Sequence, residues 1–272
     1  MEGNITTMNQ NGDVYTFPTS GGGGNDDYDG ILNVYTVSGY DSSLIDNDHS
    51  RAFAKGYMMT PRDWRDVEIT AYLNIDSNIN DQFSILTRGG KHYGSNNCEG
   101  FSYRTDLYYD GTMRQCKEQF HERFFYTPTQ NVTGSILDKW IGMKFCCYNT
   151  YHPDIMQQQQ QTNQGVILET HLDFNATNNW TKVYSYTDYG KWGNQGIVCN
   201  GASDQIGSWG GPVISLKWSN TNSIQLKWLS VREVNPYGIT NEGGSNYIAA
   251  RGIGGRGFTG SGGKDVNAGG FT

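Results

Sequence analysis

The residues best placed to do chemistry lie in the stretch from Gly100 to Phe125, where two alternating apolar and polar runs flank Asp110-Gly111. An Asp-Gly pair in this setting predicts a β-hairpin with a type I′ turn, in which both central residues have positive φ. Because side chains alternate along a strand, one face of the second run carries four nitrogen donors: Lys117, Gln119, His121 and Arg123. This face could form the floor of a groove that holds an oxygen-rich ligand. A solvated outer surface is the alternative.

Further polar groups could serve the same ligand. Arg88 and Arg104 are cationic donors on neighbouring predicted strands, and His92 follows a Gly-Gly loop that should lie at a sheet edge. Glu169 and His171 alternate with apolar residues on their own strand, so they should share one face with Asp173. These groups predict binding of a polar ligand, and the two histidines could also act as bases near neutral pH.

Short β-like runs separated by Gly, Asn, Asp and Pro must position these residues. They are Ile31–Val37, Ala52–Met59, Val67–Asn74, Gln82–Arg88, Gly100–Tyr109, Thr112–Phe125, Trp140–Asn149, Gly165–Phe174, Thr181–Thr187, Val213–Trp218 and Ile224–Val234. About eleven such runs without a sustained helical period predict an all-β sandwich. We expect a polar, Gly-rich lead-in over residues 1–30, one β-sandwich domain over 31–234 and a Gly-rich tail over 235–272.

Three local patterns refine this expectation. The strand Trp140–Asn149 is apolar on both faces apart from Lys144, which predicts a central position in its sheet. The similar runs Ser215–Ser219 and Gln225–Ser230 predict a closing hairpin across residues 220–222. Cys146 and Cys147 are adjacent on a strand, so at most one of them can face the core.

Composition narrows the class of protein. Only 17% of residues are charged, while the chain holds 18 Tyr, 7 Trp and 36 Gly, which is typical of an exported β-protein. A net charge of −7 argues against nucleic acid as a partner, and no apolar run is long enough to span a membrane. The polar start carries no secretory signal, so export would use another route or a signal already removed.

The chain also contains N-glycosylation sequons, which fit an extracellular or cell-surface glycoprotein, and acidic loops that could bind a metal ion. Asn-x-Ser/Thr sequons occur at Asn4, Asn131, Asn175 and Asn179. No cofactor is required by any motif, but acidic loops could bind structural calcium through Asp26, Asp27 and Asp29 or through Asp46 and Asp48. Solvated turn residues are the alternative explanation for these acids.

The strand count and three strands resemble the concanavalin A-like jelly roll of legume lectins, glucanases and polysaccharide lyases. The three strands begin at Trp140, at Val166 and at Leu226, and the resemblance covers roughly residues 31–234. It implies a carbohydrate-active protein. That superfamily contains binding modules and enzymes alike, so the fold alone does not choose between them.

Two motifs are similar to those of alginate lyases, which carry Gln-x-His on one strand and Tyr-x-Lys-x-Gly further on. This chain has Gln119-Phe120-His121 and Tyr189-Gly190-Lys191-Trp192-Gly193, whereas the Arg-rich third motif of that family is missing. The resemblance implies β-elimination on a uronic acid polymer, with His121 as base, Tyr189 as acid, and Gln119 and Lys191 beside the substrate carboxylate. Arg88, His92, Arg104, Lys117, Arg123, Glu169 and His171 would bind substrate.

Two other classes of function stay open. A lectin-like module would bind an acidic polysaccharide without cleaving it, using Tyr and Trp rings that stack on sugars. A structural or adhesive surface protein would instead self-assemble through the Gly-rich tail. Hydrolysis by paired carboxylates such as Glu169 and Asp173, as in retaining glucanases, ranks below elimination because the chain lacks the acidic cluster of those enzymes.

Overall fold

The computed structural model describes residues 9–11, 14–18, 30–35, 64–89, 101–119, 123–150, 165–190, 192–193, 206–208, 210–211, 213–234, 251–252, 258–260 and 265–266. The predicted strand Ala52–Met59 and the acidic loops considered for calcium lie outside these residues. Within them the chain is all-β, and no helix is present that is long and apolar enough to cross a membrane.

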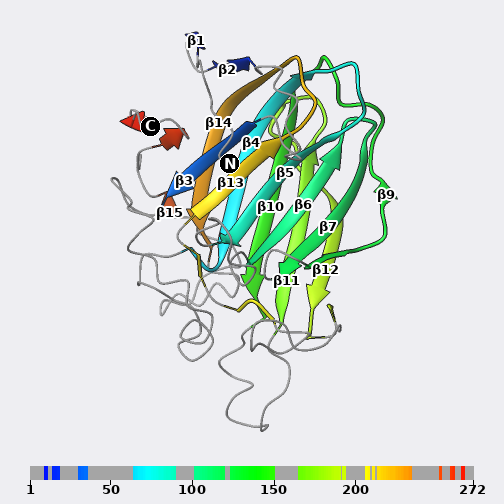
Figure 1. Ribbon diagram of the computed structural model, residues 1–272, viewed down its shortest axis with the longest axis vertical. Helices are drawn as coiled ribbons and strands as arrows, with labels where there is room; N and C mark the ends of the chain where they lie inside the picture. The colour runs from blue at the N-terminus through cyan, green and yellow to red at the C-terminus, as the bar shows by residue number, and fades with distance from the viewer. Residues whose placement is uncertain are drawn as a thin grey trace, which may run out of the picture.

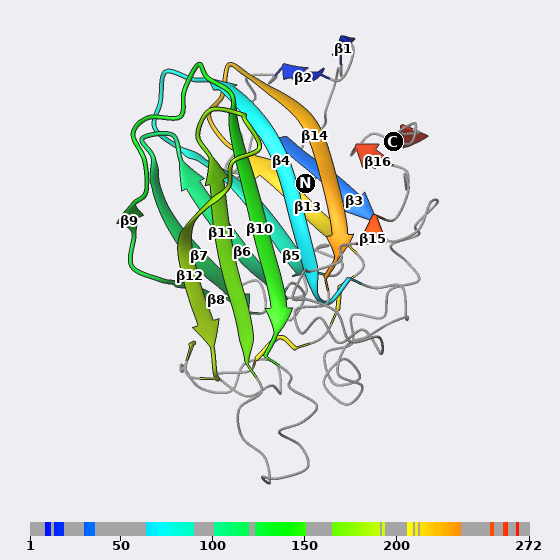
Figure 2. The same cartoon turned by 180° about the vertical axis from the view of Figure 1, so that it is seen from behind.

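Two sheets packed face to face make a β-sandwich, and Figures 1 and 2 show it from its two sides. Sheet 1 has the order β1 (Asn9–Asn11), β2 (Val14–Pro18), β14 (Ser223–Glu233), β4 (Val67–Asp76), β10 (Ile141–Asn149), β11 (Val166–Asp173) and β12 (Thr181–Asp188), with β15 (Arg251–Gly252) also on β14. Sheet 2 has the order β17 (Asp265–Val266), β16 (Phe258–Gly260), β3 (Gly30–Tyr35), β13 (Val213–Trp218), β5 (Gln82–Gly89), β6 (Phe101–Tyr108), β7 (Thr112–Gln119) and β8 (Arg123–Tyr126), with β9 (Gln130–Asn131) on β7. All of these strand pairings are antiparallel.

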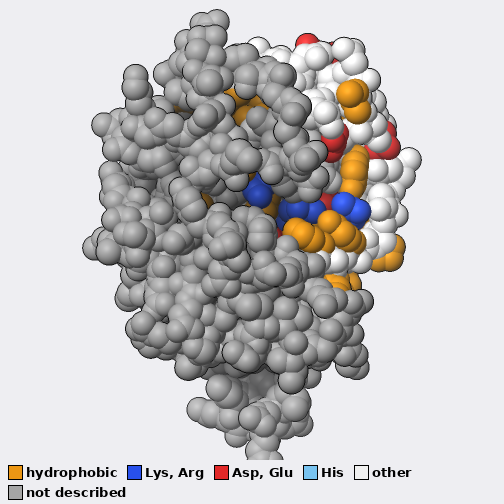
Figure 3. Space-filling view, viewed as in Figure 1, with side chains coloured by type: hydrophobic (Ala, Val, Ile, Leu, Met, Phe, Trp, Pro, Cys, Tyr) orange, Lys and Arg blue, Asp and Glu red, His pale blue; other side chains and the backbone are white. Residues whose placement is uncertain are grey.

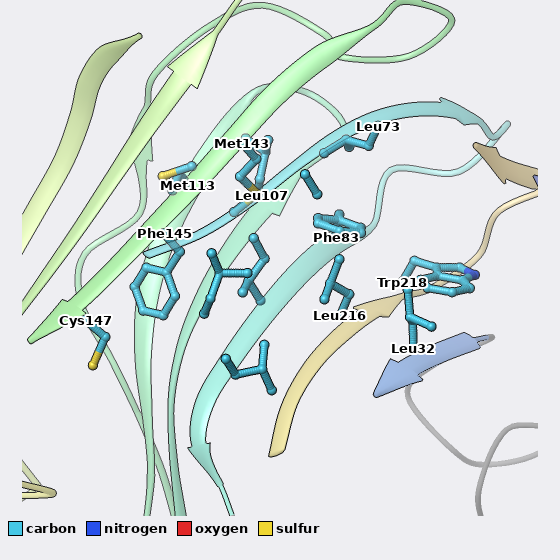
Figure 4. Close-up of a cluster of buried hydrophobic side chains, with 14 of the residues drawn as sticks. Leu32, Leu73, Phe83, Leu107, Met113, Met143, Phe145, Cys147, Leu216 and Trp218 are labelled. Carbon is cyan, nitrogen blue, oxygen red and sulfur yellow. The ribbon is translucent and has the colours of Figure 1, made fainter. Parts of the chain in front are cut away.

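The core lies between the sheets because alternate residues of each strand are apolar and point inward. Sheet 1 contributes Leu73, Met143, Phe145 and Cys147, and sheet 2 contributes Phe83, Leu107, Met113, Leu216 and Trp218 (Figure 4). Each of these side chains is at most 1% exposed. Burying one large apolar side chain stabilises a fold by roughly 1.5–3 kcal/mol, so this layer holds the two sheets together.

The sequence predicted most strands at close to their observed bounds. β10 lies between β4 and β11, which confirms the central position expected for Trp140–Asn149. Cys147 is buried in the core while Cys146 faces the other way and is half-buried, as their adjacency required. Part of the expected lead-in also joins the sandwich, since β2 pairs with β14 and the side chain of Phe17 is only 3% exposed.

The predicted long strand Thr112–Phe125 is wrong, because the chain reverses after Gln119. β8 pairs antiparallel with β7, so that Lys117 is opposite Phe125 and Gln119 is opposite Arg123. Directly opposite residues share a face of the sheet. Odd-numbered residues of β7 and β8 therefore lie on the same face of the sheet, as they would in one continuous strand. For this reason the alternation of residue types could not reveal the reversal.

The turn between β6 and β7 also differs from the predicted type I′ turn. Only Gly111 has positive φ, at 90°, and its N–H donates to the carbonyl of Tyr108 at 2.9 Å. Leu107 pairs with Met113, which leaves a three-residue loop of the kind that places Gly in the left-handed region. Tyr109 is the first residue of this loop. Its ring is fully buried, and its hydroxyl donates to the carbonyl of Ser219.

The closing hairpin predicted across residues 220–222 is likewise wrong. β13 pairs with β3 and β5 in sheet 2, whereas β14 pairs with β2 and β4 in sheet 1. The short connection therefore crosses from one sheet to the other. A polar turn between two alternating runs fits a corner as well as a hairpin, so the local pattern could not separate the two.

Candidate functional site

The sequence-predicted site residues are dispersed over several parts of the sandwich. Arg88, Lys117 and Gln119 are in the interior, Arg104 is on the outer side of sheet 2, Glu169 and His171 are on the outer face of sheet 1, and Tyr189 follows β12 with 57% of its surface exposed. His92, His121, Lys191 and the side chain of Arg123 lie outside the described residues. The described residues therefore do not form the single groove expected from the sequence.

The expected donor-rich groove floor points into the sandwich instead. Met113, on the same face of β7 as Lys117 and Gln119, belongs to the core. Lys117 is 0% exposed and Gln119 is 1% exposed. This corrects the interpretation of that face as an open surface. The physical reason is that buried polar side chains are tolerated where protein groups satisfy them.

A buried ion pair satisfies Lys117. Its Nζ donates to Oδ2 of Asp188 at 2.8 Å and to the carbonyl of Trp192 at 3.0 Å. The hydroxyl of Tyr103 donates to the same Asp188 oxygen at 2.7 Å, and the N–H of Gly190 donates to Oδ1 at 2.9 Å. Burial, followed by the negative charge of Asp188, raises the pKa of Tyr103 well above its usual range. The cluster joins β6 and β7 of sheet 2 to β12 of sheet 1.

Arg88 has a similar structural role, although it has the unusual φ of 60°. Its Nη1 donates to Oδ1 of Asn149 at 2.7 Å, and its Nε donates to the carbonyl of Arg65 at 3.0 Å. Nη2 lies 3.4 Å from a carboxylate oxygen of Asp66. The guanidinium is fully buried and connects β5 to β10 and to the chain before β4, so it is not presented to a ligand.

Glu169 and His171 lie on the outer face of sheet 1, where other charged groups surround them. Glu169 accepts a hydrogen bond from Nζ of Lys182 at 2.9 Å. His171 is opposite Lys144 on one side and Lys182 on the other. Burial, aided by these two lysines and opposed by Glu169, lowers the pKa of His171. A histidine that stays neutral over a wider pH range could accept a proton, but no described carboxylate is paired with its ring.

The outer side of the β6–β7–β8 hairpin carries a cluster that sequence reasoning mostly missed. We call it the hairpin face, and it consists of Arg104, Asp106, Arg114, Phe124 and Tyr126. Asp106 is fully buried and accepts a hydrogen bond from Ser84 at 2.8 Å. Its carboxylate lies 2.7 Å from Nε of Arg104 and 3.2 Å from Nε of Arg114. Two guanidiniums thus share the Asp106 carboxylate, and Glu118, opposite Phe124 on the same face, supplies a second buried carboxylate.

Aromatic rings lie directly beside these guanidiniums. The guanidinium carbon of Arg114 is 3.6 Å from the ring centroid of Tyr126, and that of Arg104 is 5.7 Å from the ring of Phe124. The two rings stack at 6.4 Å with an interplanar angle of 14°. Phe124 is 41% exposed and Tyr126 is 42% exposed. Figure 3 shows Lys and Arg side chains gathered between hydrophobic ones on this side of the molecule.

Tyr126 of the hairpin face and its neighbour Tyr108 are neutral phenols at physiological pH. Burial raises the pKa of Tyr108, beside Arg114, to about 12, and burial followed by Cys116 raises that of Tyr126. The side chain of Arg114 is 23% exposed, so part of it reaches solvent. The arrangement offers an open aromatic surface, a hydroxyl and guanidinium donors, which together suit a polar ring compound with acidic groups.

A one-residue error in the predicted turn explains why this cluster was missed. In the observed hairpin Asp106 pairs directly with Arg114. A two-residue loop at Asp110-Gly111 would instead place Arg114 opposite Leu107. The observed pair of opposite charges across two strands could have been found only with the three-residue loop.

No group of three or more His, Cys, Asp or Glu side chains suited to a metal ion occurs among the residues that the structure describes. In the same part of the chain, Asp173 and Asp188 are committed to hydrogen bonds with tyrosines, a lysine or backbone N–H groups.

No protein-family model and no curated protein matches the sequence. Among solved structures, a functionally unknown protein from Saccharomyces cerevisiae is similar with a TM-score of 0.33 and 4% identity, over 84% of this chain and 92% of that chain. A heptameric SAP-like pentraxin from Limulus polyphemus has a TM-score of 0.31 and 11% identity, over 80% and 75%. Scytalido-glutamic peptidase with a transition-state analogue inhibitor has a TM-score of 0.27 and 11% identity, over 76% and 77%. None of these matches bears on the activity of this chain.

Proposed function

We propose that the protein is a carbohydrate-binding β-sandwich that recognises an acidic polysaccharide without cleaving it. The observation that carries this proposal is the hairpin face, where exposed Phe124 and Tyr126 lie against the guanidiniums of Arg104 and Arg114. Sugar rings stack on aromatic side chains through their apolar C–H faces, while a guanidinium pairs with a carboxylate. The ion pair with Asp106 holds Arg114, whose side chain is 23% exposed, in place before a ligand arrives, while Arg104 is buried beneath the rings and supports them.

The finer assignments belong to the same proposal. A concanavalin A-like jelly roll is supported by the two antiparallel sheets and by the strands quoted above. An extracellular glycoprotein is supported by the sequons at Asn131, Asn175 and Asn179, all of which have exposed side chains.

Elimination chemistry is the competing hypothesis. It needs His121 and Lys191, which lie outside the described residues, to act with Gln119 and Tyr189. The burial of Gln119, at 1% exposure, favours binding over catalysis because a group that contacts substrate must be reachable.

Affinity electrophoresis in gels containing alginate, glucuronan, pectate or a neutral glucan tests the proposal. We expect retardation by the acidic polymers, and Tyr126→Ala or Arg114→Ala should weaken it about tenfold, equivalent to about 1.4 kcal/mol. Ile79→Ala is the matched control because Ile79 is 57% exposed and lies outside the hairpin face.

Unchanged retardation of both variants, or no retardation of the unmodified protein, would overturn the binding proposal. The same polymers are monitored for ultraviolet absorbance, since elimination leaves a conjugated double bond in the product. An absorbance increase that His121→Ala abolishes would establish the lyase instead.

A further inference from the structure

Aromatic rings and lysines alternate across the outer face of sheet 1. Figure 2 shows this sheet in front, on the side of the sandwich away from β6, β7 and β8. We call this cluster the tryptophan row, and it consists of Trp140, Lys227, Trp228, Tyr72, Trp180 and Lys144. Lys227 pairs with Tyr72, Tyr72 with Gly142, and Gly142 with Asp173. The row therefore follows one level of the sheet across β14, β4, β10 and β11.

The rings of the row are in direct contact with one another. The centroid of Tyr72 is 5.1 Å from that of Trp228 and 5.5 Å from that of Trp180, with interplanar angles of 81° and 65°. Nζ of Lys227 is 4.0 Å from the ring of Trp140 and 4.4 Å from that of Trp228. Edge-to-face and cation–π contacts of this kind fix the rings relative to one another.

The positions of Tyr72 and Trp180 are set by groups beneath and beside them. Asp173 accepts a hydrogen bond from the Tyr72 hydroxyl at 2.7 Å, and Oδ1 of Asn178 accepts one from Nε1 of Trp180 at 2.9 Å. A Cβ atom at Gly142 would lie 2.7 Å from the Trp180 ring and 2.9 Å from the Tyr72 ring. The absence of a side chain at Gly142 is therefore what allows both rings to lie across the strand.

Trp228 is the most exposed ring of the row. It has 46% of its surface exposed and sits at the β-bulge between Lys227 and Ser230, with φ of 51°. A left-handed backbone is unfavourable for a bulky residue, and bulges often redirect a side chain. Backbone of this kind is frequently found where a side chain is held out for a ligand.

Two carboxylates lie at the row, because Asp173 accepts the hydrogen bond of Tyr72 and Glu68 is beside Lys144. Lys227 is the cation of the row without an ion pair to a described carboxylate, and its ammonium group is held between two tryptophan rings. Lys144 lies over the Trp180 ring at 4.6 Å and is partly balanced by Glu68 at 3.5 Å. A ligand with flat apolar faces and a negative group that reaches Lys227 therefore fits this surface.

We propose that the tryptophan row is a second binding site for an acidic glycan chain, independent of the hairpin face. The C–H faces of the sugar rings would stack on Trp228 and Trp180, and uronate carboxylates would pair with Lys227 and Lys144. The net charge of −7 argues against single-stranded nucleic acid, whose phosphates need a basic surface. Because the two sites are on opposite sheets, one molecule can bind two glycan chains.

Oligoglucuronate titrations followed by tryptophan fluorescence and calorimetry test the second site. The starting protein carries Arg114→Ala and Tyr126→Ala, which removes the hairpin face from the measurement. Trp228→Ala and Lys227→Met are then added separately, with Ile79→Ala as the control. Trp228→Asn is a further variant, because Asn tolerates the left-handed backbone and keeps the fold testable.

We expect the starting protein to bind oligoglucuronate with quenching of its fluorescence, and both Trp228 variants and Lys227→Met to weaken binding at least about tenfold. Affinity equal to that of the Ile79→Ala control in all three would overturn the second site. Tighter binding of a thymidine oligonucleotide than of oligoglucuronate would also overturn it, in favour of nucleic acid. If the hairpin face does not bind glycan, the result is different: the starting protein binds as tightly as the unmodified protein before any change in the tryptophan row.

Discussion

At the scale of single residues, burial decides which polar groups are structural and which can meet a ligand. Lys117 and Arg114 come from the same predicted hairpin, yet Lys117 is committed to Asp188 inside the sandwich while the side chain of Arg114 is 23% exposed beside the ring of Tyr126. Residue type and spacing cannot distinguish these two situations. The partner of Lys117 is distant in the sequence and belongs to the other sheet.

The buried ion pair predicts a large stability loss for Lys117→Met. The variant leaves the Asp188 carboxylate buried without its cation, which costs roughly 3–5 kcal/mol of unfolding free energy. Lys182→Met is the matched control, because its ion pair with Glu169 is made by a lysine side chain that is 53% exposed and should contribute at most about 1 kcal/mol. Denaturant unfolding measures both, and equal losses would contradict the structural role of Lys117.

Asp173 predicts an acid-dependent part of the stability. Burial alone would raise its pKa, but hydrogen bonds from Tyr72 and from the N–H groups of Thr177, Asn178 and Asn175 outweigh burial and lower it. A carboxyl with a lowered pKa stabilises the fold fully above its unfolded value, which is about 3.9, and this contribution is lost as the pH falls through the folded value.

We therefore expect Asp173→Asn to destabilise the protein at neutral pH and to flatten the fall in stability below about pH 4. Urea unfolding at a series of pH values measures this. An acid limb as steep in Asp173→Asn as in the unmodified protein would assign the acid sensitivity to other carboxyl groups.

At the scale of elements, the sequence predicted the strands better than their connections. Alternation and turn residues located β4, β5, β10 and β11 because each of these strands buries one mostly apolar face. Alternation did not reveal the reversal between β7 and β8, because odd-numbered residues of both strands lie on the same face of the sheet. It also did not reveal that the chain passes from one sheet to the other between β13 and β14. Predicting the hairpin face would have required the register of β6 and β7, which one turn sets. Predicting the tryptophan row would have required the order of four strands within sheet 1.

The turn at Gly111 allows a direct test of that register. Gly111 has φ of 90°, and an added Cβ would lie 2.2 Å from the carbonyl oxygen of Thr133 and 2.4 Å from that of Gly134. Gly111→Ala should therefore cost more than the roughly 1–2 kcal/mol of a left-handed backbone alone. Gly134→Ala is the control because nothing lies within 4 Å of its added Cβ. Thermal unfolding that ranks the two variants equally would argue against the three-residue loop.

At the scale of the whole molecule, the outer faces of the two sheets point away from each other, and each carries aromatic rings beside cations. A glycan chain bound to the hairpin face cannot reach the tryptophan row without passing around an edge of the sandwich. With a long polymer, the two faces of one protein molecule should therefore bind different polymer chains. Several protein molecules between the same two chains then increase the overall binding strength by multivalency.

This geometry predicts that the protein cross-links long acidic polysaccharides. Turbidity and viscosity of a glucuronan solution should rise with added protein to a maximum and then fall, because excess protein saturates each chain separately. Tyr126→Ala and Trp228→Ala should each abolish the maximum while leaving binding of short oligosaccharides at the other face. A protein ending at Val234 separates this mechanism from self-assembly, since the tail adds β15 to β14 and β16 to β3. Persistence of the maximum in both single-site variants, with its loss in the shortened protein, would show that the tail and not the two faces joins the polymer chains.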